Sequence, residues 1–137
     1  MIVLDTHVLV WLMEGSGRLG KNSIAKIDQA ASRSELLVPA ISVWEIALLV
    51  EKGRLALSQD LDQWVERVFA LPGVGLAPLE PAIALEGARL PGGFHGDPAD
   101  RLIAATARHH NAALMTVDRA ILAYASAGHL KAIDATQ

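Results

Sequence analysis

Two aspartates stand directly after apolar runs, where a carboxylate is informative about chemistry. Asp5 follows residues 2–4 and Asp118 follows residues 113–117, and both runs are typical of buried β-strands. An acid at the carboxyl tip of a buried strand lies at the sheet edge where α/β proteins bind ligands. Each aspartate also has a structural alternative as the N-cap of the next helix, which begins near Thr6 in the first case.

Two further acidic sites stand near the starts of predicted helices. Glu45 lies in the pattern Ser42-x-x-Glu45, which is typical of a capping box whose glutamate bonds back to the cap residue. Asp97 and Asp100 lie in the pattern Asp-Pro-Ala-Asp, where Asp97 is the expected N-cap and Pro98 the first helical residue. The helix dipole favours Asp100 in the first turn, so each of these acids also has a structural explanation.

The combination of these acids indicates chemistry more strongly than any single one. In a parallel sheet the carboxyl ends of the strands share one edge, so the acids can converge in one cleft. Carboxylates at close range raise one another's pKa unless a cation shares the site. Mg²⁺ and Mn²⁺, which prefer oxygen ligands, are the natural partners. Such a site can activate water and stabilise the charge that develops in phosphodiester hydrolysis.

Short apolar runs alternate with amphipathic segments along the chain. Strands are predicted at residues 2–4, 36–38, 74–77, 113–117 and 132–133, and helices at residues 6–13, 24–32, 42–52, 60–71, 81–90 and 97–110, with a short helix opening at Asp118. Asn22 or Ser23 is the expected cap of the second helix. This alternation predicts an α/β fold, a three-layer α/β/α domain with a mostly parallel central sheet. We expect residues 1–137 to form a single domain.

Composition narrows the functional classes. The 137-residue chain has 12 basic and 15 acidic residues, a net charge of −3, 52% apolar residues and no cysteine. The apolar content excludes a disordered chain, and the lack of cysteine excludes disulfides, thiolate zinc sites and a cysteine nucleophile. Patterns for phosphate-binding loops, dinucleotide binding and serine hydrolases are absent. Without a signal peptide or an apolar run of about 18 residues, we expect a cytoplasmic protein with no membrane partner.

Histidines and tryptophans carry less information. His7 follows Asp5 closely, but on the first helix we expect it to pack or to face solvent. Trp11, Trp44 and Trp64 fall inside helical patterns, and we interpret them as core or interface residues. A protein that reads RNA by stacking would need more aromatic residues than the 4% present, so we do not expect stacking platforms.

Four segments together resemble PIN-domain ribonucleases, most closely the toxins of VapBC-type (type II) toxin–antitoxin systems. These segments are residues 2–7, the Ser42-x-x-Glu45 pattern, residues 95–107 and residues 115–118. The resemblance extends from Asp5 to about Ala135, and the Asp97-to-Arg101 block is its most specific piece. It implies a three-layer PIN fold with an acidic pocket at the carboxyl edge of the sheet.

The resemblance also implies a role for each site residue. The family's four acids correspond to Asp5, Glu45, Asp100 and Asp118. Asp5 and Asp100 would ligate Mg²⁺ (or Mn²⁺), while Glu45 and Asp118 would bind the ion directly, act through water or orient water. Thr6 and Thr116 would hold the acids in place, and Asp97 would position Asp100 as the helix cap.

The resemblance implies single-stranded or structured RNA as the substrate. It also implies two partners, a second copy of this chain and a small antitoxin protein whose tail blocks the acidic pocket. Two other functions remain open. A haloacid-dehalogenase-like phosphatase also begins with an aspartate after the first strand, but it needs another aspartate two residues later, where this chain has His7. A non-catalytic interaction module of PIN fold is the second alternative, which the four acids argue against.

Overall fold

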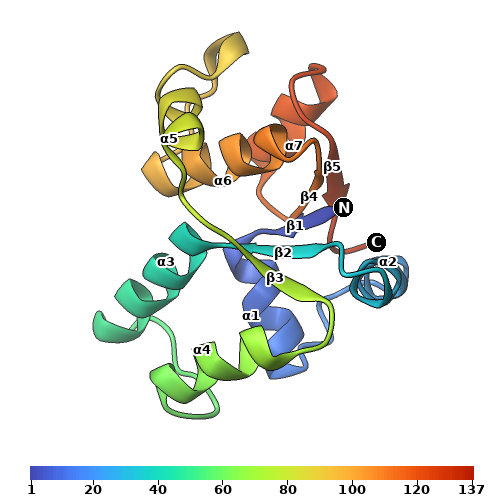
Figure 1. Ribbon diagram of the computed structural model, residues 1–137, viewed down its shortest axis with the longest axis vertical. Coiled ribbons are helices and arrows are strands. Elements are labelled where there is room, and N and C mark those ends of the chain that lie inside the picture. Colours follow the sequence, from blue (N-terminus) through green and yellow to red (C-terminus); the bar gives the residue numbers. More distant parts are fainter.

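Five parallel strands form the centre of the molecule. The computed structural model describes residues 1–137, and its strands are β1 (Ile2–Leu4), β2 (Leu36–Pro39), β3 (Val74–Ala77), β4 (Ala113–Thr116) and β5 (Ala132–Asp134). Their order across the sheet is β3-β2-β1-β4-β5, and every neighbouring pair is parallel (Figure 1). The predicted parallel sheet is therefore confirmed, with β1 at its centre.

Helices cover both faces of this sheet. They are α1 (Thr6–Glu14), α2 (Lys21–Ser32), α3 (Ala40–Glu51), α4 (Leu61–Ala70), α5 (Pro81–Ala88), α6 (Pro98–His109) and α7 (Arg119–Ser126). Helices α1 to α4 pack on one face and α5 to α7 on the other (Figure 1). The predicted three-layer α/β/α arrangement is confirmed. None of these helices is both long enough and apolar enough to cross a bilayer.

Side chains of the central strands alternate between two cores. Leu4 and Met115 pack with α1 to α4, whereas Val3 and Leu114 pack with α5 to α7. All four are fully buried, as expected of strands covered on both faces. Trp64 belongs to the first core and is 1% exposed, which confirms its predicted place inside the protein.

The starts of two helices differ from the sequence prediction. Helix α2 begins at Lys21 after Gly20, so neither Asn22 nor Ser23 is its cap. The last residues of the chain pass so close to Gly20 that a Cβ there would lie 2.1 Å from the backbone of Gln137. Long-range packing of the terminus thus sets this helix start. Helix α3 begins at Ala40, two residues before Ser42, with Pro39 at the N-cap position.

The connections place several chain segments at one edge of the sheet. Strand β1 runs into α1, β2 into α3 and β4 into α7, so these helices start where their strands end. Helix α6 contacts α3, which brings its first turn to the same edge. The sheet therefore positions Asp5, Glu45, Asp100 and Asp118 as a parallel α/β fold predicts.

Candidate metal centre

Asp5 is the most buried acid of the centre. It is 5% exposed and is the N-cap of α1, where its Oδ1 accepts a hydrogen bond from the Thr6 backbone N–H at 2.8 Å. Its Oδ2 accepts a hydrogen bond from the Thr116 hydroxyl at 2.6 Å. Burial raises the pKa of Asp5, and these two hydrogen bonds oppose the rise. Asp5 therefore combines the two alternatives that the sequence left open. It is the N-cap of α1, and it also lies at the carboxyl edge of the sheet with the other acids.

Glu45 does not form the predicted capping box. Because α3 begins at Ala40, Glu45 lies in the second turn of the helix, too far along to bond back to a cap. Its Oε1 instead accepts a hydrogen bond from the Thr6 hydroxyl at 2.5 Å, and Thr6 is also hydrogen-bonded to the Ser42 hydroxyl at 3.1 Å. Burial raises the pKa of Glu45, and the charge of Asp5 adds to the rise.

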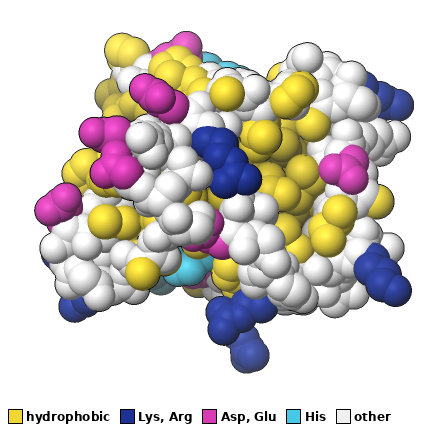
Figure 2. Space-filling model, turned by 90° about the horizontal axis from the view of Figure 1, so that it is seen from below, with side chains coloured by type: hydrophobic (Ala, Val, Ile, Leu, Met, Phe, Trp, Pro, Cys, Tyr) yellow, Lys and Arg dark blue, Asp and Glu magenta, His cyan; other side chains and the backbone are white.

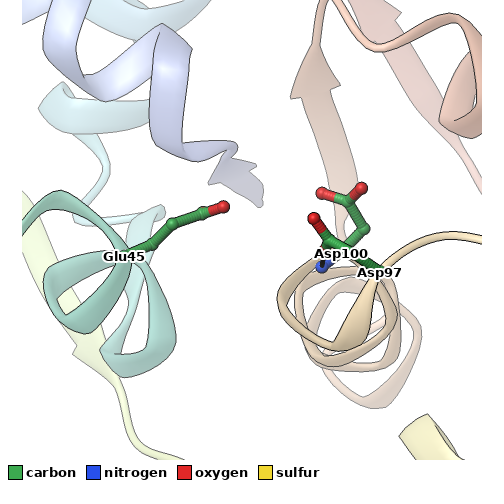
Figure 3. A group of neighbouring side chains, drawn as sticks. All are labelled: Glu45, Asp97 and Asp100. Atoms are coloured by element: carbon green, nitrogen blue, oxygen red, sulfur yellow. Dashed lines mark hydrogen bonds between the residues drawn. The ribbon is translucent and has the colours of Figure 1, made fainter. Parts of the chain in front are cut away.

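The first turn of α6 carries two acids with different roles. Asp97 is the N-cap, as predicted, and its Oδ1 accepts a hydrogen bond from the Asp100 backbone N–H at 2.8 Å. Asp100 is half-buried, and burial is the main cause that raises its pKa to about 7. The surrounding carboxylates add to this rise, Asp97 first and then Asp118, Asp5 and Glu45. Figure 3 shows Glu45 reaching from α3 toward Asp97 and Asp100.

Asp118 completes the acidic group from the end of β4. It is the N-cap of α7, and its Oδ1 accepts a hydrogen bond from the Ile121 backbone N–H at 3.0 Å. Its own N–H donates to the Thr116 hydroxyl at 3.0 Å, and that hydroxyl in turn donates to Asp5. Thr6 and Thr116 thus each donate a hydrogen bond to an acid of this group, and each links two chain segments.

The acids share one pocket of about 270 Å³. Its lining residues are Asp5, His7, Glu45, Asp97, Asp100, Val117 and Asp118. One carboxylate oxygen each from Glu45, Asp97 and Asp100 lies within 4.8 Å of the others. Asp97 therefore belongs to the tightest group of oxygens, whereas its sequence pattern predicted only a helix cap. His7 is exposed to solvent, as expected, but it also lines the pocket, and its position two residues after Asp5 was the only signal for this.

This donor set is chemically selective. The pocket offers many carboxylate oxygens and no lysine or arginine, and His7 is the one lining side chain whose charge opposes the rise in the pKa of Asp5 and Glu45. Hard divalent cations that prefer oxygen ligands fit such a site, and their charge would lower the raised pKa values of Asp5, Glu45 and Asp100.

Known proteins resemble this chain in sequence and in fold. A model of the PIN domain family matches residues 2–127. Ribonuclease VapC22 of Mycobacterium tuberculosis is 37% identical over 118 residues, which cover 86% of this chain and 87% of the relative. VapBC2 of Rickettsia felis contains a chain that aligns with a TM-score of 0.68, 18% identity and coverage of 97% of this chain and 98% of the other. FitAcB of Neisseria gonorrhoeae contains a chain that aligns with a TM-score of 0.66 and 24% identity. This alignment covers 98% of the present chain and 97% of the FitAcB chain.

Proposed function

This chain belongs to the PIN domain family, and we propose that it is a metal-dependent endoribonuclease, the toxin component of a toxin–antitoxin pair. The observation that carries the proposal is the convergence of acids from four separate segments in one pocket. The 37% identity to a protein named as a ribonuclease supports RNA as the substrate. We further propose that residues 1–137 form one such domain.

The proposed ion is Mg²⁺ or Mn²⁺. Asp5 and Asp100 are the proposed direct ligands, with Glu45 and Asp118 binding the ion directly or through water. The proximity of Asp97 to Glu45 and Asp100 supports its inclusion in this set. When bound, the cation would supply stabilisation for the negative charge that develops on the phosphate oxygens.

The protein's own groups orient the acids and move the proton. Hydrogen bonds from Thr6 and Thr116 restrict the carboxylate of Asp5 to one orientation. Substrate binding therefore does not have to restrict the rotation of this carboxylate. Glu45 accepts a proton from the attacking water, and the hydrogen bond from the Thr6 hydroxyl orients its carboxylate for this transfer. The water oxygen bonds to phosphorus, the ester P–O bond breaks, and the leaving oxygen takes a proton from solvent.

RNA cleavage by the purified chain tests this function. We expect cleavage in Mg²⁺ or Mn²⁺ and none in chelator, and Asp100→Asn should lower the rate at least about 100-fold, since electrostatic groups of an active site commonly contribute that much. Asp62→Asn is the matched control, because Asp62 is an exposed acid on α4. Equal activity of the wild type and Asp100→Asn would leave the non-catalytic module as the better explanation. Hydrolysis of a small phosphoester that Asp5→Asn abolishes would favour the phosphatase instead.

An apolar groove between α1, α2 and α4 supports the proposed antitoxin partner. This α1–α2–α4 groove has a volume of about 290 Å³ and contains Leu12, Ile27, Ala31 and Leu71, with Asp28 and Arg67 beside them. Figure 2 views the molecule from the α4 side and shows hydrophobic side chains gathered between a basic and an acidic group. We propose that an amphipathic segment of the antitoxin fills this groove, with its own charges paired to Asp28 and Arg67.

Complex formation tests the partner independently of catalysis. Coexpression with the product of a short reading frame directly upstream should give a stable complex, and Ala31→Glu should weaken it while RNA cleavage is retained. Retention of the complex by Ala31→Glu would contradict the groove assignment. Self-association remains a further prediction, and a clean monomer in light scattering at micromolar concentration would contradict it.

A further inference from the structure

A second cavity adjoins the acidic pocket. It has a volume of about 260 Å³ and lies between α3 and the first turn of α6. Glu45 and Asp97 line both cavities, so the two cavities are neighbours. The far part of the second cavity has a different character, because Trp44, Lys52 and Arg54 line it together with apolar residues. We call this part the Trp44 shelf.

Trp44 is unusual among the tryptophans. It is 56% exposed, whereas Trp64 is 1% exposed, so of the two roles predicted for the tryptophans, core or interface, the core role is wrong for Trp44. Trp44 and Glu45 both line the second cavity, so the indole lies near the catalytic carboxylate proposed above. A large exposed aromatic surface next to a reaction site is costly in water and is well suited to stacking against a planar ligand.

The two basic residues of the shelf have no carboxylate partner. Lys52 and Arg54 are exposed, and neither makes an ion pair or a side-chain hydrogen bond within the protein. Arg108 shows the contrast, because its guanidinium is bonded to Glu86. The charges of Lys52 and Arg54 are therefore available to an anionic ligand that enters the shelf.

We propose that the Trp44 shelf binds single-stranded RNA next to the cleaved bond, with one base stacked on Trp44 and backbone phosphates bound by Lys52 and Arg54. The inference rests on the proposed ribonuclease function and narrows its substrate class. An aromatic ring can stack only on a base whose face is free, which a regular duplex does not offer. The cations favour the phosphates of this strand at the shelf, whereas the acidic pocket repels phosphate until a metal ion binds.

RNA binding in chelator tests the shelf without any cleavage. The probe is a fluorescently labelled single-stranded oligoadenylate, with its anisotropy as the readout, and a second oligonucleotide of the same length carries abasic sites. Trp44→Leu should weaken binding of the intact RNA about 5- to 150-fold, which corresponds to the roughly 1–3 kcal/mol that one stacked base contributes. Trp44→Phe should restore most of the affinity, and Trp44→Leu should barely change the binding of abasic RNA.

The basic residues need a charge-matched comparison. Lys52→Gln and Arg54→Gln should each weaken binding of both RNAs and reduce its salt dependence, whereas Arg33→Gln should not, because Arg33 ends α2 and precedes β2, at the amino edge of the sheet. Equal affinity of Trp44→Leu and wild type for intact RNA would overturn the proposal, as would equal weakening for intact and abasic RNA. A change in oligomeric state without a change in RNA affinity would instead make Trp44 an interface residue.

These outcomes separate the shelf from the ribonuclease proposal. A chain that binds RNA through Trp44 but cleaves none in any metal would overturn the nuclease function and support the shelf. A chain that cleaves RNA equally well with Trp44→Leu, at RNA concentrations below the dissociation constant, would support the nuclease function and overturn the shelf.

Discussion

The two ends of the sheet both carry clusters of charged side chains, but only one end pairs them. At the amino ends of β4 and β5, Arg108 donates to Glu86 at 2.8 Å and to the carbonyl of His129. Lys131 donates to Asn111 at 3.0 Å in the same cavity. At the carboxyl ends, acids face other acids, and the pKa of Asp100 rises to about 7.

This contrast distinguishes paired charges, which stabilise the fold, from like charges that repel one another unless a ligand binds between them. Paired groups lower the free energy of the folded protein by themselves, whereas a cluster of like charges raises it until something else binds. Proteins retain such unfavourable clusters at functional sites. A cavity with many charges is therefore not by itself a site, and the sign and pairing of those charges favour the carboxyl end of this sheet as the proposed active site.

Of the changes that test this contrast between the two ends, loss of one hydroxyl at the carboxyl end should have the largest effect. Thr116→Val removes the hydroxyl that joins Asp5 to the Asp118 backbone, and we expect RNA cleavage to fall about 10- to 100-fold, as for other residues that orient metal ligands. The kcat/KM for RNA cleavage is the measurement. Thr106→Val is the control, since the buried Thr106 hydroxyl bonds only to a carbonyl of its own helix. An equal loss in both variants would attribute the effect to packing.

Loss of a paired charge at the amino end should change stability and not activity. Arg108→Met leaves Glu86 without its partner, and we expect the free energy of unfolding to fall by about 1–2 kcal/mol, because both side chains are partly exposed. Chemical denaturation measures this loss, with Arg119→Met as the control on an exposed arginine that has no ion pair. A drop in the RNA cleavage rate with unchanged stability would contradict the division between the two ends.

The smallest effect is a pH dependence of the metal-free protein. The pKa of Asp100 lies at about 7 in the folded protein against an ordinary value of 3.8, so between these pH values the folded state holds a proton that the unfolded state has lost. Stability from this group is therefore present at low pH and is lost as pH rises toward 7. Thermal unfolding in chelator should show a melting temperature that falls as pH rises toward 7. Asp100→Asn should make this dependence of the melting temperature on pH weaker.

Half-exposure of Asp100 limits the size of this effect to about 1 kcal/mol after allowance for solvent screening. Added Mg²⁺ or Mn²⁺ should raise the melting temperature of the wild type at pH 7.5 and leave that of Asp100→Asn nearly unchanged. A melting temperature that rises with pH in the wild type, but not in Asp100→Asn, would show that Asp100 is already ionised without metal.

The sheet and the site edge were predictable because they depend on local patterns. Apolar runs of two to five residues between amphipathic segments indicated the strands, and the rule that parallel strands end together placed Asp5 and Asp118 at one edge. The cap role of Asp97 followed from the Asp-Pro pair, whose geometry is also local.

Features that depend on distant contacts were not predictable. Glu45 matched a capping box, but α3 begins at Ala40 and its second turn faces Thr6, which no local pattern indicates. The membership of Asp97 in the oxygen cluster depends on how α6 packs against α3. The exposure of Trp44 likewise depends on which face of α3 the rest of the chain covers.

The central position of β1 also has a consequence for synthesis. Strand β1 is translated before the other strands, and Thr116 at the end of its neighbour β4 lies 111 positions after Asp5. A nascent chain therefore exposes Asp5 long before Thr116 and Asp118 exist to complete the pocket. A chain whose translation stops before Thr116 therefore lacks the assembled group of acids.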